Sequence, residues 1–529
     1  MIKYFEICLK EDIMKTYARI IALICAILML VPCFASCANT QGSEETTANN
    51  AQTQVTPEDT TPAVDPNYDK EGFWKDDLAD EIDFKGETVT ILYWDDVERA
   101  EFEITEEEAD GDMVKDAIYR RNLATEERMG VTFEWIGTPG DGSDRAAFTS
   151  YVRNAYSGGT FYDIIATYSR TAGMLLTNGF IQDLNEIEDS YINVEQPWWP
   201  KSMLDTCSIK DSLFFVSGDI STNVLHFMYA VYYNMDMLDD LNLDDPVALV
   251  DEKKWTIDAL INLSKGLYVD LDQDGTQSDY DQYGFCSTYF HLDAFYTGSD
   301  MMLLVPGQDK YLEISEDFFG QKTIDMVDKL GGWFRDGDTY VNTSGGSRNY
   351  SVPFEEGLCL FRCDRVYVAD TEYHNGALRN VDWEYGILPV PMYDENQTEY
   401  ITVVGNPFTL WCVMQNAKNP QMSTAVIECM ASEAYRKTSP MIFEQNMKYR
   451  YTPDSVGKGD SARMFDIIRE SIAFDLGRIF SDILSFMSEM PSKAASTSSS
   501  WASMKAQYER TLKRSMSDLN KDLEAVLDN

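Results

Sequence analysis

The hydrophobic pattern after residue 85 alternates short apolar runs with longer stretches of helical spacing. Residues 87–94 (Glu-Thr-Val-Thr-Ile-Leu-Tyr-Trp) predict a strand, and residues 112–129 predict a helix that stops at Gly130. A strand at 131–136, a helix at 143–157 and a buried strand at 162–167 follow. Strands that alternate with helices of this length indicate βαβ units around a parallel sheet. The predicted fold class is therefore α/β.

The rest of the chain continues this pattern less regularly. Strands are predicted at 229–234, 358–361 and 384–391, and an amphipathic helix at 255–268. Residues 436–529 predict mostly helix, with a Ser-rich break at 496–500. No internal repeat is visible, and the length of the chain predicts two or three domains.

The N-terminus has the pattern of a secretory signal. Residues 20–31 are uninterrupted apolar sequence behind Lys15 and Arg19, too short to span a bilayer. Phe34-Ala35-Ser36-Cys37 is similar to a bacterial lipobox, in which the cysteine is lipidated; ordinary cleavage nearby is the alternative. Residues 38–66 lack periodic apolar positions and predict a disordered tether. We expect a signal peptide over 1–36, a lipidated tether over 37–84, and attachment to the extracellular face of the cell membrane through the lipid alone.

The charge balance excludes some partners. The chain has 529 residues, 43 Lys and Arg against 89 Asp and Glu, and a net charge of −46. Such a surface repels phosphates, which argues against nucleic acid and anionic lipid. The acidity is uneven: residues 37–116 hold five basic against 24 acidic residues, whereas 436–529 hold 14 against 13. Most of the acidic residues therefore serve to keep the protein solvated, and the net charge does not indicate the charge of a binding site.

The cysteines do not form a disulfide framework. Six follow Cys37, at a density far below that of a disulfide scaffold. Cys359 and Cys363 lie on one predicted strand, about 13 Å apart, which is too far for a bridge. We expect these two to be small buried hydrophobes.

Several motifs occur together in a fixed order. Quoted in chain order, they are Val89-Thr-Ile-Leu-Tyr-Trp94, Phe161-Tyr-Asp-Ile-Ile-Ala-Thr-Tyr-Ser-Arg170, Gly179-Phe-Ile-Gln-Asp-Leu184, Tyr232-Tyr-Asn-Met-Asp-Met-Leu238, Trp255-Thr256, Tyr283-Gly-Phe285, Gly386-Ile-Leu-Pro-Val-Pro391 and Asn416-Ala-Lys-Asn-Pro420. This series resembles the extracellular solute-binding proteins of ABC importers, family 1, the carbohydrate type. Trp255-Thr256 reverses the order usual in that family. The resemblance covers roughly residues 85–525.

The resemblance implies a type II periplasmic-binding fold with two lobes that close on a solute like a hinge. We expect the first lobe over 85–222 plus 400–440, and the second over 223–399 plus 441–529, with a helical C-terminal region. Crossing segments are expected near 219–229 and 392–404. The implied partners are a sugar or oligosaccharide and the transmembrane subunits of an ABC permease, and we expect a monomer.

Candidate ligand-binding residues follow the predicted strands, because solutes bind at the carboxyl ends of strands in open α/β sheets. A sugar needs aromatic platforms and polar partners. The candidates are Trp94, Asp95, Tyr168, Ser169, Arg170, Asp219, Asn223, His226, Tyr289, His291, Asp293, Arg362, Asp364 and Asn406. The alternative for Arg170 is a structural ion pair, and for His226 and His291 it is hydrogen-bonded packing.

Residues 270–281 have the spacing of a calcium loop. Asp270, Asp272 and Asp274 occupy positions 1, 3 and 5, and Gly275 follows at position 6. Thr276 supplies the carbonyl at position 7, and Asp281 stands at position 12, where Glu is usual. The loop therefore predicts a structural Ca²⁺ ion; a solvated Asp-rich turn without an ion is the alternative.

The sequence favours a binding protein over an enzyme. It contains no metalloprotease, serine-hydrolase, phosphate-loop or dinucleotide motif. We therefore expect no catalytic residue and no catalytic cofactor. The function alternative is a lipid-anchored extracellular glycosidase, since 89 acidic residues always supply carboxylate pairs.

Overall fold

The computed structural model describes residues 67–69, 72–308, 310–370, 376–451, 459–497 and 500–528. The predicted signal peptide, Cys37 and the tether up to residue 66 lie outside the described residues and stay predictions. No helix of the described part is both long enough and apolar enough to cross a membrane. The contacts group the residues after 65 into a compact unit of their own, and the two lobes belong to this unit.

The first lobe is built on a four-stranded sheet in the order β12-β3-β1-β2. β1 runs parallel to β2 and β3, and β12 joins β3 antiparallel from much later in the chain. The inner strands read as continuous apolar runs because helices cover both faces of the sheet. The strands are β1 (Glu87–Trp94), β2 (Val131–Thr138), β3 (Ile164–Tyr168) and β12 (Thr409–Val413).

The helices of the first lobe begin and end where local chemistry requires. α3 (Met113–Met129) is capped by the Asp112 carboxylate, which accepts from two backbone N–H groups, and it stops at Gly130 with φ 63°. α5 (Ser169–Thr177) follows β3 directly and packs against β12. The remaining helices here are α2 (Glu106–Ala109), α4 (Arg145–Gly158), α6 (Lys201–Cys207) and α14 (Pro420–Glu433), of which α14 packs on α3.

The second lobe is built on a five-stranded sheet in the order β10-β4-β9-β5-β8. β5 is parallel to β8 and β9, whereas β4 is antiparallel to β9 and β10. The strands are β4 (Tyr229–Asn234), β5 (Tyr283–Thr288), β8 (Thr339–Asn342), β9 (Cys359–Arg365) and β10 (Tyr385–Leu388), with a separate hairpin of β6 (Leu304–Pro306) and β7 (Leu312–Ile314).

Short helices surround the second sheet. They are α8 (Met235–Asp240), α9 (Pro246–Asp251), α10 (Ile257–Ser264), α11 (Asp293–Gly298), η2 (Glu316–Phe319), α12 (Gln321–Arg335), α13 (Val352–Glu355), η3 (Val366–Ala369) and η5 (Ala377–Asn380).

Two neighbouring segments join the lobes, as the sequence predicted. One runs through α7 (Thr222–His226) into β4, and the other runs from β10 through β11 (Thr402–Val403) to β12. They meet where Met228 pairs with Val404 and where Gly405 donates its N–H to the Phe227 carbonyl. Paired extended segments of this kind form a hinge.

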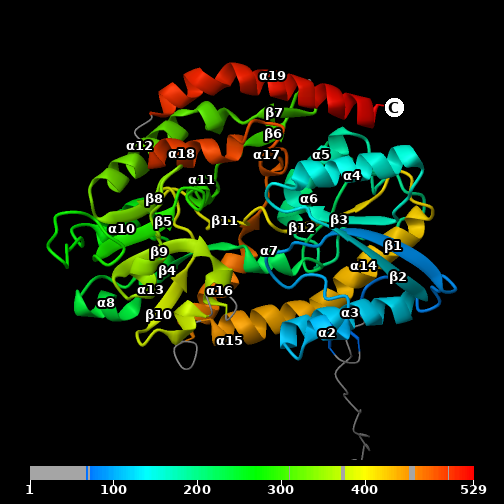
Figure 1. Cartoon of the computed structure of the whole chain (residues 1–529), viewed down its shortest axis with the longest axis horizontal. Coiled ribbons are helices and arrows are strands. Elements are labelled where there is room, and N and C mark those ends of the chain that lie inside the picture. The colour runs from blue at the N-terminus through cyan, green and yellow to red at the C-terminus, as the bar shows by residue number, and fades with distance from the viewer. Residues whose placement is uncertain are drawn as a thin grey trace, which may run out of the picture. The chain divides into compact units, whose positions relative to one another are not determined.

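The C-terminal segment touches both lobes. α16 (Asp460–Glu470) packs on β10, α17 (Leu476–Ile479) on α5, and α18 (Met490–Ser496) on α12. α19 (Trp501–Leu527) contacts α12 and α18 as well as α5, and Figure 1 shows this red helix lying across all three. The other elements of the segment are η6 (Ala434–Thr438), η7 (Met441–Met447), α15 (Lys448–Arg450), β13 (Ile472–Ala473) and η9 (Met487–Glu489).

The α/β class and the two-lobe arrangement are thus confirmed. The exact lobe boundaries stay a prediction, and the contacts of α17 and α19 with α5 show that residues 441–529 do not pack on the second lobe alone. The described cysteines (Cys207, Cys286, Cys359, Cys363, Cys412 and Cys429) are all free and buried, and Cys359 and Cys363 both lie on β9 as predicted.

Candidate functional site

The carboxyl edge of the first sheet carries two arginines that face the C-terminal segment. The Arg170 side chain is only 6% exposed and lies 3.5 Å from an Asp482 oxygen and 3.3 Å from a Glu489 oxygen. Arg145, at the start of α4, donates its Nε to Asp482 over 2.6 Å. Two acidic residues of the segment between α17 and α18 are therefore held at the ends of β2 and β3.

The carboxyl edge of the second sheet meets the same segment. Asp293 begins α11, and its carboxylate accepts a 2.7 Å hydrogen bond from Arg478 of α17. The two side chains are 5% and 7% exposed. Burial raises the pKa of the Asp293 carboxyl, while Arg478 and also Arg170 of the first lobe act to lower it. The edges of the two sheets therefore face one another across this segment.

His291, two residues before Asp293 in the chain, is fully buried. Its Nδ1 lies 3.2 Å from Asp364, whose other oxygen accepts from Arg362 over 2.7 Å. Burial lowers the pKa of His291 to about 3, so the ring is neutral. Burial alone would raise the pKa of Asp364, but the guanidinium groups of Arg362 and Arg365 outweigh it and lower that pKa. Arg362 and Asp364, which the sequence predicted as ligand-binding residues, are instead buried inside β9 and pair with each other.

Among the described residues, the buried polar atoms without a hydrogen-bond partner include four at the two sheet edges. Each such atom costs roughly 1–3 kcal/mol unless water or a solute satisfies it. They are Arg170 Nε of the first lobe, and Thr288 Oγ1, His291 Nε2 and Asp293 Oδ1 of the second. We call Arg170, Thr288, His291, Asp293, Arg478, Asp482 and Glu489 the interlobe site.

The other residues predicted to bind a ligand at the edge of the first sheet are not part of the interlobe site. Trp94 is fully buried, donates its indole N–H to Thr409 over 2.9 Å, and meets the Tyr168 ring edge-on at 5.3 Å. It is a packing residue with no free surface for a solute. Ser169 donates to the Asn406 carbonyl over 2.6 Å, and Asp95 is exposed.

The three predicted hinge residues do not join the interlobe site. Asp219 pairs with Arg469 at 3.1 Å beside a cavity of about 450 Å³. Asn223 is buried on α7, and neither atom of its amide group has a hydrogen-bond partner within the described structure. Burial lowers the pKa of His226 to about 4, and this ring lines a cavity of only about 40 Å³. Asn223 and His226 lie on α7, and Asp219 lies shortly before it, in the segment that leads into β4.

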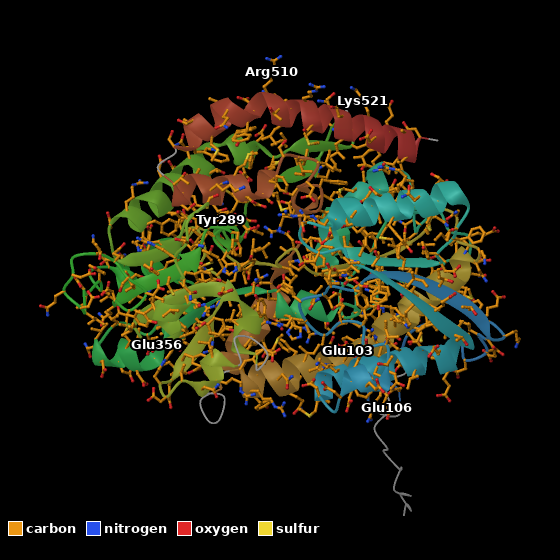
Figure 2. The ribbon with its side chains drawn as sticks, in the orientation of Figure 1. Glu103, Glu106, Tyr289, Glu356, Arg510 and Lys521 are labelled. Atoms are coloured by element: carbon orange, nitrogen blue, oxygen red, sulfur yellow. The ribbon has the colours of Figure 1, made fainter. Side chains whose placement is uncertain are left out.

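Sequence patterns did not reveal the residues that connect the two edges. Arg145, Arg478, Asp482 and Glu489 were not among the candidates, because three of them lie in a region that predicted only helix. Tyr289, a half-buried candidate after β5, lies in the middle of Figure 2, where the Lys493 ammonium is 5.9 Å from its ring centre. A single charged residue in a helical region carries no signal for such a site.

The acidic loop brings three predicted metal ligands together. Carboxylate oxygens of Asp270, Asp272 and Asp274 lie within 4.8 Å of one another. Asp270 also accepts from the Gly275 N–H over 2.8 Å, and its Oδ1 is buried without a hydrogen-bond partner. Asp281 instead closes the loop, accepting from the N–H groups of residues 271 and 278. Thr276 donates to Asp274 through both its N–H and its hydroxyl.

No family model matches the chain, and no curated protein matches its sequence. Solved structures are similar in fold. The GacH receptor of Streptomyces glaucescens, solved unliganded and with acarbose, has a TM-score of 0.51 and 14% identity, covering 83% of this chain and 99% of that one.

Two further structures give the same picture. The galacto-N-biose-/lacto-N-biose I-binding protein of the ABC transporter from Bifidobacterium longum has a TM-score of 0.53 and 12% identity, covering 83% and 98% of the chains. The extracellular solute-binding protein from Staphylococcus aureus in complex with maltose has a TM-score of 0.50 and 10% identity, covering 84% of this chain and 99% of that one. The chain has the two-lobe α/β fold of these binding proteins.

Proposed function

We propose that the protein is an extracellular solute-binding receptor that captures a sugar or oligosaccharide between its lobes and delivers it to an ABC permease. The fold it shares with sugar-binding proteins supports this function. The observation that carries the proposal is the interlobe site, where buried polar atoms of both sheet edges lack hydrogen-bond partners and both edges contact the same C-terminal segment. A solute rich in hydroxyl groups can donate to Asp293 and His291 and accept from Arg170 and Thr288 at once.

Capture works by closure of the two lobes on the solute. A solute that touches both edges binds the closed state more tightly than the open one, and this difference in affinity shifts the equilibrium toward closure. The paired segments at Met228 and Val404 supply the hinge. The closed receptor then offers surfaces of both lobes to the permease subunits.

The proposal includes a lipid anchor at Cys37 and a monomeric receptor on the outer face of the cell membrane. The apolar run at 20–31, the lipobox-like residues before Cys37 and the low-complexity stretch over 38–66 support it. An anchor and a tether keep a receptor close to its permease. The strongly acidic composition keeps it soluble there and supports the absence of a nucleic-acid partner.

The charge pairing at the site favours binding over glycoside hydrolysis. A glycosidase needs one carboxyl group with a raised pKa as its acid and a second carboxylate as its base or nucleophile. Burial raises the pKa of Asp293, but its carboxylate is held by Arg478 at 2.7 Å. Burial would raise the pKa of Glu489, but Lys493 and Arg170 outweigh it and lower that pKa. Asp482 is paired with both Arg145 and Arg170, at 2.6 Å and 3.5 Å.

We also propose a structural Ca²⁺ ion in the loop over 270–281. Its oxygen-only donor set suits a hard cation, and the partnerless Asp270 Oδ1 fits a metal ligand. Asp270, Asp272 and Asp274 would hold the ion. Its chemistry there would be to neutralise these carboxylates and fix the loop before β5.

A thermal-unfolding screen tests the receptor proposal. The purified protein is heated with maltose, maltotetraose, lacto-N-biose, acarbose, polyols and short peptides. Saturable stabilisation by a saccharide, recovered intact afterwards, is expected. Stabilisation by peptides alone, or conversion of the stabilising saccharide to product, would refute the proposed function.

A further inference from the structure

The loop between α17 and η9 presents a phenylalanine beside the interlobe site. Phe486 is 43% exposed, whereas its neighbours Leu484 and Met487 are fully buried. The two buried side chains anchor the loop at both ends. Because Leu484 and Met487 occupy the interior, the Phe486 side chain is left partly exposed to solvent.

The backbone at this position is held in an unfavourable conformation. Ser485 and Phe486 have φ of 58° and 60°, in the left-handed region that favours glycine. A bulky aromatic residue at such a φ is an outlier, and outliers of this kind concentrate at functional sites. The Phe486 N–H donates to the Ser481 carbonyl over 2.7 Å and closes the turn. A glycine would make the same turn without strain, so the aromatic ring needs another explanation.

The ring stands over the charged part of the interlobe site. The Arg170 guanidinium carbon lies 5.9 Å from the Phe486 ring centre. Residues on both sides of the loop tie it to the same place, because Asp482 and Glu489 both pair with Arg170. Glu489 in turn pairs with Lys493 at 2.9 Å. Phe486 therefore lies at the edge of the first lobe. The pair of Glu489 and Lys493 connects its loop to α18, which packs on α12 of the second lobe.

Arg170, the cation over the ring, and the two cations that share its acidic partners are all in ion pairs. Arg145 and Arg170 both reach Asp482, and Lys493 reaches Glu489. A solute that approaches Phe486 therefore meets paired charges and an aromatic side chain that is 43% exposed. This combination suits an uncharged molecule that has an apolar face and a hydroxylated rim.

We infer that Phe486 is the platform on which the apolar face of an uncharged sugar ring stacks, and that it selects cyclic saccharides over open-chain polyols. The inference rests on the proposed function and specifies the class of its solute. The C–H groups on one face of a pyranose pack on an aromatic ring, whereas a flexible polyol presents no such face. The paired charges then accept and donate hydrogen bonds at the rim.

The test compares Phe486→Ala and Phe486→Gly with the full-length wild type. The probe is whichever of maltose, maltotetraose, lacto-N-biose and acarbose binds the wild type most tightly by calorimetry, with sorbitol as the open-chain comparison. Phe161→Ala is the matched control. Phe161 is 42% exposed and also lies under a cation, Lys418 at 4.7 Å, but it precedes β3 at the opposite edge of the sheet.

Both Phe486 variants are expected to bind the saccharide at least about tenfold more weakly, with sorbitol binding absent or equally weak in all proteins. Phe161→Ala is expected to bind like the wild type. The unliganded Phe486→Gly variant should unfold at the same or a higher temperature than the wild type, because glycine relieves the strain. This last result separates a ligand platform from a structural residue.

The two proposals fail in different ways. Wild-type binding that is unchanged in Phe486→Ala, or sorbitol that binds as tightly as the saccharide, overturns the platform and leaves the receptor function standing. A fall in unfolding temperature of Phe486→Gly without loss of affinity also overturns it. A wild type that binds none of the four saccharides overturns both.

Discussion

The ion pair between Arg478 and Asp293 joins α17, which packs on the first lobe, to the start of α11 in the second. Substitution of Arg478→Met keeps most of the side-chain length and removes the charge. It leaves the Asp293 carboxylate buried without its ion-pair partner, with one of its oxygens already lacking a hydrogen bond. Removing one partner of a buried pair destabilises a protein by about 3–5 kcal/mol.

The size of the loss depends on pH, because the abandoned carboxyl group can take up a proton instead. Protonating Asp293 from its ordinary pKa of 3.8 costs about 4.4 kcal/mol at pH 7 and about 1.6 kcal/mol at pH 5. In the variant the folded-state pKa of Asp293 lies above its unfolded value. Stability is therefore retained below pH 3.8 and falls as the pH rises. We expect a loss of about 3–4 kcal/mol at pH 7 and of at most about 1.6 kcal/mol at pH 5.

Urea unfolding of the wild type and the variant at pH 5 and pH 7 measures both values. The double variant with Asp293→Asn is the control, since it removes the stranded charge and should show little extra dependence on pH. Equal destabilisation of Arg478→Met at the two pH values would contradict this electrostatic explanation. So would a loss below about 1 kcal/mol at pH 7.

Four further outcomes are expected. Calcium at about 1 mM should raise the unfolding temperature of chelated wild-type protein but not of Asp274→Ala, and equal behaviour of the two would exclude the loop as a metal site. The folded-state pKa of His291, about 3 against an ordinary 6.5, means that stability falls as the pH drops through 6.5. The loss between pH 7.5 and 5.5 is about 1.4 kcal/mol and should vanish in His291→Gln; an unchanged pH profile in that variant would show that the folded-state ring titrates normally. Glu428 is a buried residue of α14 that accepts hydrogen bonds from the indole N–H groups of Trp198 and Trp199. Burial raises its pKa to about 8 from 4.5, so stability falls as the pH rises between these values. Glu428→Gln should flatten the stability profile by about 2.5 kcal/mol between pH 5.5 and 7.5, and an unchanged or steeper profile would contradict the assignment. Cys37→Ser should release the receptor from the membrane fraction of producing cells, and full retention there would argue against the lipid anchor.

The fold was largely predictable because its strands and helices carry strong local patterns. The first strand was predicted over 87–94 and is found there, and the helices predicted over 112–129 and 143–157 run over 113–129 and 145–158. The strand after Leu358 is longer than predicted, since β9 continues through charged residues to Arg365. Arg362 and Asp364 neutralise each other inside the sheet, and such compensation cannot be seen in an apolar pattern.

The candidate site was only partly predictable. Arg170, His291 and Asp293 follow strands at the carboxyl edge of a sheet, where the topology rule points. Trp94 follows the same rule but is covered by Tyr168 and Thr409. Asp482 and Phe486 reach the site through a segment that crosses between the lobes late in the chain. Their placement depends on tertiary packing, and the left-handed backbone at Phe486 leaves no mark in the residue types.

Isothermal titration calorimetry of the purified receptor with maltose, maltotetraose, lacto-N-biose and acarbose is the sharpest test of sugar capture. At least one saccharide is expected to bind at a single saturable site, with heat that returns to the baseline after every injection. Continuous heat production would show turnover and contradict a binding protein. The absence of binding heat for every saccharide, at several temperatures, would contradict sugar capture itself.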